Sequence, residues 1–131
     1  MYFHTFNSRE ELRIFGGSYF IEVQYCKLAS CSKIKEIIAV DAIEHWKNDS
    51  LYIYGDDDEE FTSYYGEIFT GGIYNNEKRG VVDLCGINYY SQEQTEHIME
   101  RVKKERPIDY QTLLRWLEKA DKYNGIYVLG L

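Results

Sequence analysis

Apolar and polar residues alternate with a period of two in several stretches of the chain, and this pattern predicts β-strands. Residues 19–25 give the clearest example, a strand with one buried face. Residues 51–54 and 61–69 are rich in aromatic and β-branched side chains and predict two more strands. Two mostly apolar runs, 81–87 and 126–129, predict central strands, and the second run contains no charge, so we expect it inside the sheet.

Other stretches have apolar residues three and four positions apart, which predicts helices. Ser8 and Glu11 have the spacing of a capping box and precede a short apolar stretch. Ser91 and Gln94 repeat that spacing before a longer helix, which ends before the single proline of the chain. Asp109 follows, and we expect it to cap a last helix with a strong apolar face.

Residues 33–47 allow two interpretations. A helix capped by Ser32 would place Ile34 and Trp46 on one broad apolar face, whereas the run 37–40 would suit a buried strand. Periodicity does not decide between them in so short an apolar run. We expect the helix.

Together these elements predict a single α+β domain over residues 1–131. Its sheet is antiparallel or mixed, with about five to six strands, and two C-terminal helices pack on one face. A chain of 131 residues with 44% hydrophobic residues is long enough to bury one core. The chain has neither an apolar run of membrane-spanning length nor a signal-peptide pattern, so we expect a cytoplasmic protein without membrane association.

Negative charge is concentrated in the middle of the chain. The net charge is −7, and from Glu36 to Glu67 there are ten carboxylates against one base, Lys47. An unbroken acidic block, 56–60, is expected at a hairpin tip or on a loop beside one. Such a charge distribution repels phosphate backbones and attracts basic proteins, so it predicts one outward acidic patch for a basic protein partner and no direct nucleic-acid binding.

The candidate residues for metal or covalent chemistry lack the required spacing. Block 56–60 does not match a calcium-binding loop, and the cysteines and histidines show no paired zinc-ligand spacing. We therefore expect no cofactor and no metal. The three cysteines, Cys26, Cys31 and Cys85, are expected to be reduced and packed. A nucleophilic role for Cys85, with His45 or His97 as base, remains a lesser alternative, and we expect the protein not to be an enzyme.

Tyrosines give the acidic region a second distinctive property. The chain has thirteen tyrosines, and seven of them lie between residues 51 and 90. About half of the tyrosines on alternating strands should face the core, and the others would present rigid rings that suit a protein interface. We therefore predict a partner-binding surface made of Asp56, Asp57, Asp58, Glu59 and Glu60 together with Tyr52, Tyr54, Tyr64 and Tyr65. The competing interpretation is that these tyrosines are ordinary strand residues of a soluble acidic protein.

The C-terminal part of the chain resembles a known class of proteins. The resemblance covers about residues 80–131 and the charge character. It is carried by the segment Gly80-Val81-Val82-Asp83-Leu84-Cys85-Gly86-Ile87, the Ser91-capped helix, the segment Leu113-Leu114-Arg115-Trp116-Leu117 and the closing segment Gly125-Ile126-Tyr127-Val128-Leu129-Gly130-Leu131. These features resemble bacterial immunity proteins of contact-dependent growth inhibition and other polymorphic toxin systems. The resemblance implies a non-enzymatic cytoplasmic inhibitor that binds one cognate toxin, often a nuclease with a basic cleft, and it assigns no individual site residue.

Two other functions remain open at this stage. The first is a DNA-mimic or anti-CRISPR-like inhibitor of a nucleic-acid enzyme, which would use the same acidic surface. The second is a small enzyme that uses Cys85 or His97. The sequence does not indicate the oligomeric state.

Overall fold

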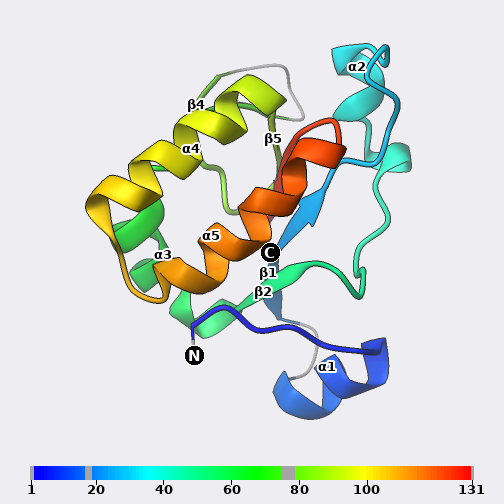
Figure 1. The fold of residues 1–131 in the computed structure, drawn as a ribbon. Coiled ribbons are helices and arrows are strands. Elements are labelled where there is room, and N and C mark those ends of the chain that lie inside the picture. Colours follow the sequence, from blue (N-terminus) through cyan, green and yellow to red (C-terminus); the bar gives the residue numbers. More distant parts are fainter. Residues whose placement is uncertain (1, 17–18, 75–78, 131) are drawn as a thin grey trace.

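The computed structural model describes residues 2–16, 19–74 and 79–130. The helices are α1 (Arg9–Gly16), α2 (Ile34–Ile37), α3 (Asp58–Tyr65), α4 (Gln92–Glu105) and α5 (Tyr110–Glu118), with the 3-10 turns η1 (Val40–Ala42), η2 (Gly55–Asp57) and η3 (Lys119–Lys122). The strands are β1 (Phe20–Tyr25), β2 (Leu51–Tyr54), β3 (Thr70–Tyr74), β4 (Arg79–Val81), β5 (Ile87–Tyr90) and β6 (Ile126–Leu129). Figure 1 shows their arrangement.

The six strands form one antiparallel sheet in the order β2-β1-β6-β5-β3-β4. Strand β6 lies between β1 and β5, where Val128 is opposite Val23 and Tyr127 is opposite Tyr89. The uncharged run that forms β6 is therefore inside the sheet, as predicted. A strand that is covered on both faces and paired along both edges is typically rich in apolar residues.

Helices α4 and α5 cover one face of the sheet, and α3 packs into the same core (Figure 1). Phe61 from α3, Ile98 from α4 and Leu113 from α5 meet Val23 and Val128 of the sheet in this core. The predicted α+β fold, with two C-terminal helices on one face, is confirmed.

The opposite face of the sheet is covered by shorter pieces. Alternation along the strands turns Phe20 and Tyr52 to this face, where they pack against Leu12 of α1. Further along the same face, Ile37 of α2 packs with Tyr127. Every residue of β1 is consequently buried. The expectation that this strand buries one face is wrong, because both faces of the sheet are covered.

The two predicted capping boxes have different outcomes. At α4 the backbone N–H of Gln94 donates to the Ser91 hydroxyl (3.2 Å), and the Ser91 N–H donates to the Gln94 side chain (3.0 Å), so the box is complete. At α1 the N–H of Glu11 donates to the Ser8 hydroxyl (3.1 Å), but the Glu11 carboxylate accepts from the N–H of Asn7 instead (3.1 Å).

Asp109 precedes α5 as predicted, but its side chain does not cap that helix. Its Oδ2 atom accepts hydrogen bonds from the backbone N–H groups of Tyr2 (3.0 Å) and Phe3 (2.8 Å), and its Oδ1 atom accepts from the Thr112 hydroxyl (2.7 Å). The carboxylate thus ties the beginning of the chain to the beginning of α5.

The middle of the chain departs most from the prediction. The stretch 55–65 is helical and the strand expected over 61–69 does not form. Phe61 and Tyr65 lie four residues apart, so a helix buries both in the core, and the acids before them are favoured at a helix N-terminus.

Two other predicted elements are shorter than expected. The helix expected over 33–47 reduces to α2 and η1, and Lys33 instead of Ser32 is its N-terminal residue. The central strand expected over 81–87 is divided between the edge strand β4 and the inner strand β5. A turn separates the two strands, in which Gly86 N–H donates to the Asp83 carbonyl (3.3 Å).

Candidate functional site

Two of the four tyrosines predicted to bind a partner are core residues. Tyr52 is 2% exposed and Tyr65 is fully buried. The Tyr52 hydroxyl donates to the Lys47 carbonyl (2.8 Å), and the Tyr65 hydroxyl donates to the Ile108 carbonyl. Burial, assisted by nearby carboxylates, raises the pKa of both phenols. The prediction that Tyr52 and Tyr65 contact a partner is wrong, because their rings and hydroxyls are used inside the fold.

The other two predicted tyrosines are accessible. Tyr54 ends β2 and is half-buried, and Tyr64 lies on α3 and is exposed. Burial raises the pKa of Tyr2, and Asp57, Glu60 and Tyr64 raise it further. Glu60 and Tyr64 therefore both lie near Tyr2, which places Tyr64 close to the acids of its own helix. The structure therefore retains Tyr54 and Tyr64 as candidate contact residues.

The acidic block occupies η2 and the first turn of α3. Asp56, Glu59 and Glu60 are exposed, and Asp57 and Asp58 are half-buried. Their position at a helix N-terminus is electrostatically favourable. None of the five forms an ion pair with a basic residue in the described ranges. They lie on a helix and not on a hairpin tip or loop, which corrects the predicted placement.

The ten carboxylates between residues 36 and 67 do not form one patch. Glu36 on α2 lies on the opposite side of the molecule from α3 (Figure 1). Glu44 pairs with Lys47 (3.1 Å), and the hydrogen bond from that lysine holds the pKa of Glu44 below its usual value. Asp49 pairs with Lys27 (2.7 Å). The prediction of a single outward acidic patch is therefore wrong, and residues 56–60 are the unbroken run of acids that remains together.

A group of exposed apolar side chains on and after α1 lies near the end of β2, which leads into the acidic block. Ile14 is 79% exposed, Phe15 is 53% exposed and Tyr19 is 48% exposed. The Phe15 ring lies 6.5 Å from the Tyr54 ring, centroid to centroid, with an edge-on orientation. The Tyr19 ring lies so close to Gly55 that a Cβ atom there would be 2.0 Å from it, which explains the glycine between Tyr54 and the acids.

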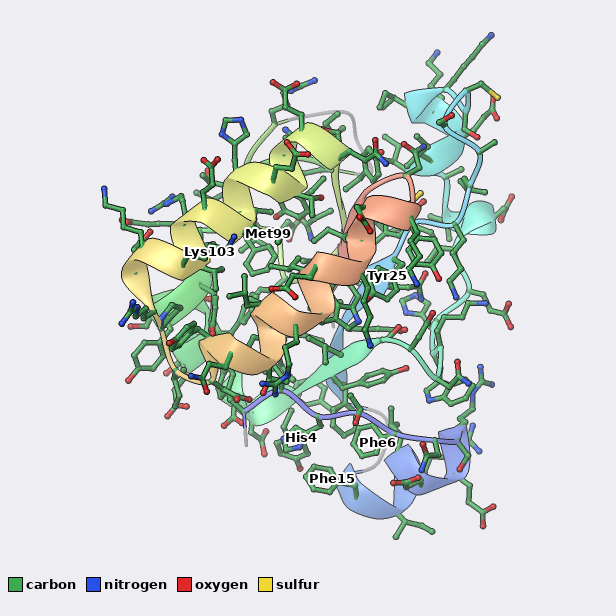
Figure 2. The ribbon with its side chains drawn as sticks, in the orientation of Figure 1. His4, Phe6, Phe15, Tyr25, Met99 and Lys103 are labelled. Atoms are coloured by element: carbon green, nitrogen blue, oxygen red, sulfur yellow. The ribbon has the colours of Figure 1, made fainter. Side chains whose placement is uncertain are left out.

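His4 connects the apolar group to the acids. Its ring lies 4.7 Å from that of Phe15, and Figure 2 shows His4, Phe6 and Phe15 gathered beside α1. The charge of Asp57 also acts on His4. We call the combined set the aromatic–acidic surface; it consists of Ile14, Phe15, Tyr19, Tyr54, Tyr64 and the acids Asp56, Asp57, Asp58, Glu59 and Glu60.

Sequence reasoning missed the apolar half of this surface. Helix α1 has eight residues, and Leu12 is its buried residue. Ile14 and Leu12 are two positions apart, so they cannot lie on the same helical face. That spacing is the signal in the sequence, and the exposure of Phe15 depends on tertiary packing that the sequence pattern does not specify.

The residues proposed for covalent chemistry are not brought together by hydrogen bonds. Cys26 is buried, whereas Cys31 and Cys85 are exposed, so the prediction of three packed thiols is wrong for two of them. Cys85 lies in the turn between β4 and β5, where its N–H donates to the Asp83 carboxylate (2.9 Å). Within the described ranges, no hydrogen bond joins Cys85 to His45 or His97, and no group of three potential ligands is arranged to hold a metal ion.

A comparison of the chain with protein-family models, curated proteins and solved structures found no match. In the part of the chain that the structure describes, no helix is both long and apolar enough to span a bilayer.

Proposed function

We propose that this protein is a non-enzymatic immunity protein, which binds and neutralises a basic toxin domain through the aromatic–acidic surface. One observation carries the proposal. Two large apolar side chains, Phe15 and Tyr19, are exposed close to Tyr54 and Gly55, which directly precede acids 56–60, and these acids have no ion-pair partner among the described residues. A basic partner could therefore bury the apolar side chains and form ion pairs with the carboxylates.

The two halves would contribute in different ways. Rigid aromatic rings provide most of the binding free energy of an interface when a partner buries them away from water. The carboxylates mainly accelerate association with a positively charged partner and select against other partners. A nuclease toxin suits this surface because its substrate cleft must be basic to bind nucleic acid.

The charge distribution favours this function over a DNA mimic. A mimic of a phosphate backbone needs negative charges along an extended surface. Here Glu44 and Asp49 are paired with lysines and Glu36 lies far from α3. The five acids that remain together suit a local contact with a basic protein. The cytoplasm is the proposed location, since the three free cysteines would remain reduced there.

Charge-neutralising variants test the acidic half. The triple variant Asp56→Asn/Glu59→Gln/Glu60→Gln should associate with the toxin domain encoded beside the gene about tenfold more slowly at low salt, and with a weaker salt dependence. Stopped-flow mixing measures both quantities. The matched control neutralises three exposed acids elsewhere, Glu36→Gln/Asp41→Asn/Glu118→Gln, and should keep the faster rate. Equal rates for the two triple variants would show that acids 56–60 are not the contact.

A second pair of variants tests the apolar half. Phe15→Ser should accelerate dissociation of the complex by about tenfold or more, because it removes an anchor. Val81→Ser is the control, since Val81 is also an exposed apolar residue but lies on the edge strand β4. Co-expression with the toxin should restore bacterial growth, and Phe15→Ser should reduce that protection. The absence of a toxin reading frame beside the gene would contradict the immunity role.

A further inference from the structure

A pocket of about 270 Å³ lies between α1, the strands β1 and β2, and the segment before β2. It is on the sheet face opposite α4 and α5. Its walls are apolar and aromatic, and it also contains one carboxylate and three basic side chains. The lining residues are Arg9, Leu12, Arg13, Phe20, Glu22, His45, Trp46 and Tyr52, and we call this the α1 pocket.

Glu22 is the buried charge of the α1 pocket. It is 4% exposed, and no basic side chain of the described ranges pairs with it. Its Oε2 atom is well satisfied, with the Ser50 hydroxyl at 2.7 Å and the Lys47 N–H at 3.1 Å. Its Oε1 atom accepts a hydrogen bond only from the Trp46 N–H (2.8 Å) among the described residues. A carboxylate oxygen can accept more than one hydrogen bond, so Oε1 can accept from a ligand.

Trp46 has two unusual properties at the same place. Its φ angle is +73°, in the left-handed region that side chains with a Cβ atom rarely adopt. Its indole Nε1–H is buried and donates to no acceptor in the described part of the protein. Backbone strain and a buried donor without an acceptor are both concentrated at binding sites, where a ligand supplies the missing partner.

Two arginines line the α1 pocket, although the protein has a net charge of −7. The Arg9 guanidinium lies 5.9 Å from the centroid of the Trp46 ring and donates to the His45 carbonyl (3.2 Å). Neither Arg9 nor Arg13 forms an ion pair with a described carboxylate. Guanidinium groups in this arrangement are suited to a phosphate or a carboxylate.

We propose that the α1 pocket binds a planar heteroaromatic molecule with one anionic group. Its ring would pack against the aromatic walls, while an N–H of the ring or of an amino group on it would donate to Glu22 Oε1, and a ring nitrogen or carbonyl oxygen would accept from Trp46 Nε1–H. The anionic group would bind Arg9 and Arg13. A nucleoside monophosphate and a heteroaromatic carboxylate both have this chemistry. The proposal does not depend on toxin binding, because none of the pocket-lining residues belongs to the aromatic–acidic surface.

Titration calorimetry with a defined set of compounds tests the proposal. The phosphate probes are AMP, GMP, CMP and UMP, and the carboxylate probe is benzimidazole-5-carboxylate, which has both a ring N–H and a ring nitrogen that accepts hydrogen bonds. Inorganic phosphate and acetate serve as controls without a ring. At least one ring-containing probe should bind with a Kd below about 1 mM and at least about tenfold more tightly than its control. The probe class that binds identifies the anionic group.

Variants locate the binding. Arg13→Ala changes an exposed residue of α1 and should weaken binding of the best probe by about tenfold. Trp46→Phe removes the indole Nε1–H, which has no acceptor among the described residues, and should weaken binding of the same probe. Arg115→Ala, an exposed arginine of α5 that does not line the pocket, should have no effect. Absence of binding by every probe, equal binding of ring-containing and simple anions, or unchanged binding by Arg13→Ala would each overturn the proposal.

Discussion

The two layers that cover the sheet are built in different ways. On one face, α4 and α5 have fourteen and nine residues, and the hydroxyls of two buried strand tyrosines beneath them are paired: Tyr25 donates to the Trp116 carbonyl (2.6 Å) and Tyr90 donates to the Phe69 carbonyl (2.9 Å). On the other face, α1 and α2 have eight and four residues. That layer contains Trp46, whose φ is positive and whose indole N–H has no acceptor among the described residues, and it covers a buried carboxylate of β1, Glu22.

This difference indicates a division of roles. A layer whose helices bury a broad apolar face stabilises the fold, whereas strained backbone and exposed aromatic groups cost stability and are retained where they serve binding. Both candidate binding regions, the aromatic–acidic surface and the α1 pocket, include residues of α1. The α4–α5 layer then acts as the rigid support that keeps the sheet beneath them in place.

The largest expected effect comes from removing the Trp116 ring of the α4–α5 layer. Removing the Phe15 ring of the other layer gives the comparison. Trp116 is buried, its ring stacks on Tyr25 at 3.9 Å, and its Nε1–H donates to the Asp49 carbonyl (2.7 Å). Trp116→Ala should lower the free energy of unfolding by about 3–5 kcal/mol. Phe15→Ala should lower it by less than about 1 kcal/mol, since half of that ring is already exposed. Urea denaturation monitored by circular dichroism measures both changes in the free energy of unfolding. Equal losses for the two variants would contradict the division of roles between the two layers.

A smaller effect is expected at the link between the first residues of the chain and α5. Asp109→Asn keeps a side chain that tolerates the left-handed φ of +56°, but it replaces the charged acceptor of the Tyr2 and Phe3 N–H groups. The free energy of unfolding should fall by about 1–3 kcal/mol at pH 7. Asp121→Asn, an exposed acid of η3, is the matched control and should be neutral.

The pH dependence of Asp109 gives an independent check on that link. Burial alone would raise its pKa, but hydrogen bonds from Phe3, Thr112 and Tyr2 outweigh burial and lower it. The stabilisation is therefore complete above the usual aspartate pKa and is lost as the pH falls through the lower value of the folded state. The difference between wild type and Asp109→Asn should shrink in acid, and a constant difference would show that the lost interaction is not that of the charged carboxylate.

The sequence was most informative where local chemistry and burial agree. The absence of charge in residues 126–129 predicted the central strand β6, and Ser91 with Gln94 predicted the start of α4. In both cases a few adjacent residues contain the deciding physical requirement: full burial for the strand and satisfied N–H groups for the helix.

The sequence was least informative where long-range packing decides. Aromatic residues in 61–69 suggested a strand, yet burial of Phe61 and Tyr65 on one face requires a helix. The same limit explains the site, because alternation along β1 and β2 turns Glu22 and Tyr52 to the second sheet face. Whether that face is solvent or core depends on how α1 and residues 38–50 fold back over it, which alternation along the strands does not specify. Tyrosine content alone could not separate buried Tyr52 from exposed Tyr19.

The smallest expected effect is at His4, where the aromatic–acidic surface meets the core. Burial lowers the pKa of His4 below its usual value, although the charges of Asp57 and Asp109 oppose that shift. The unfolded chain therefore binds a proton at a higher pH than the folded protein does. His4 stabilises the fold fully above the usual histidine pKa, and this contribution is lost as the pH falls from about 6.5.

A histidine substitution isolates this effect from other titrating groups. Between about pH 7 and pH 5, wild type should lose more unfolding free energy than His4→Gln, because the variant has no proton to bind at that position. His97→Gln changes an exposed histidine of α4 and should retain the wild-type loss. Denaturation curves at several pH values give the three slopes. If the unfolding free energy of His4→Gln and of wild type changes with pH by the same slope, the contact of His4 with Phe15 does not disfavour the charged form of His4. Acidification would then leave that part of the aromatic–acidic surface intact.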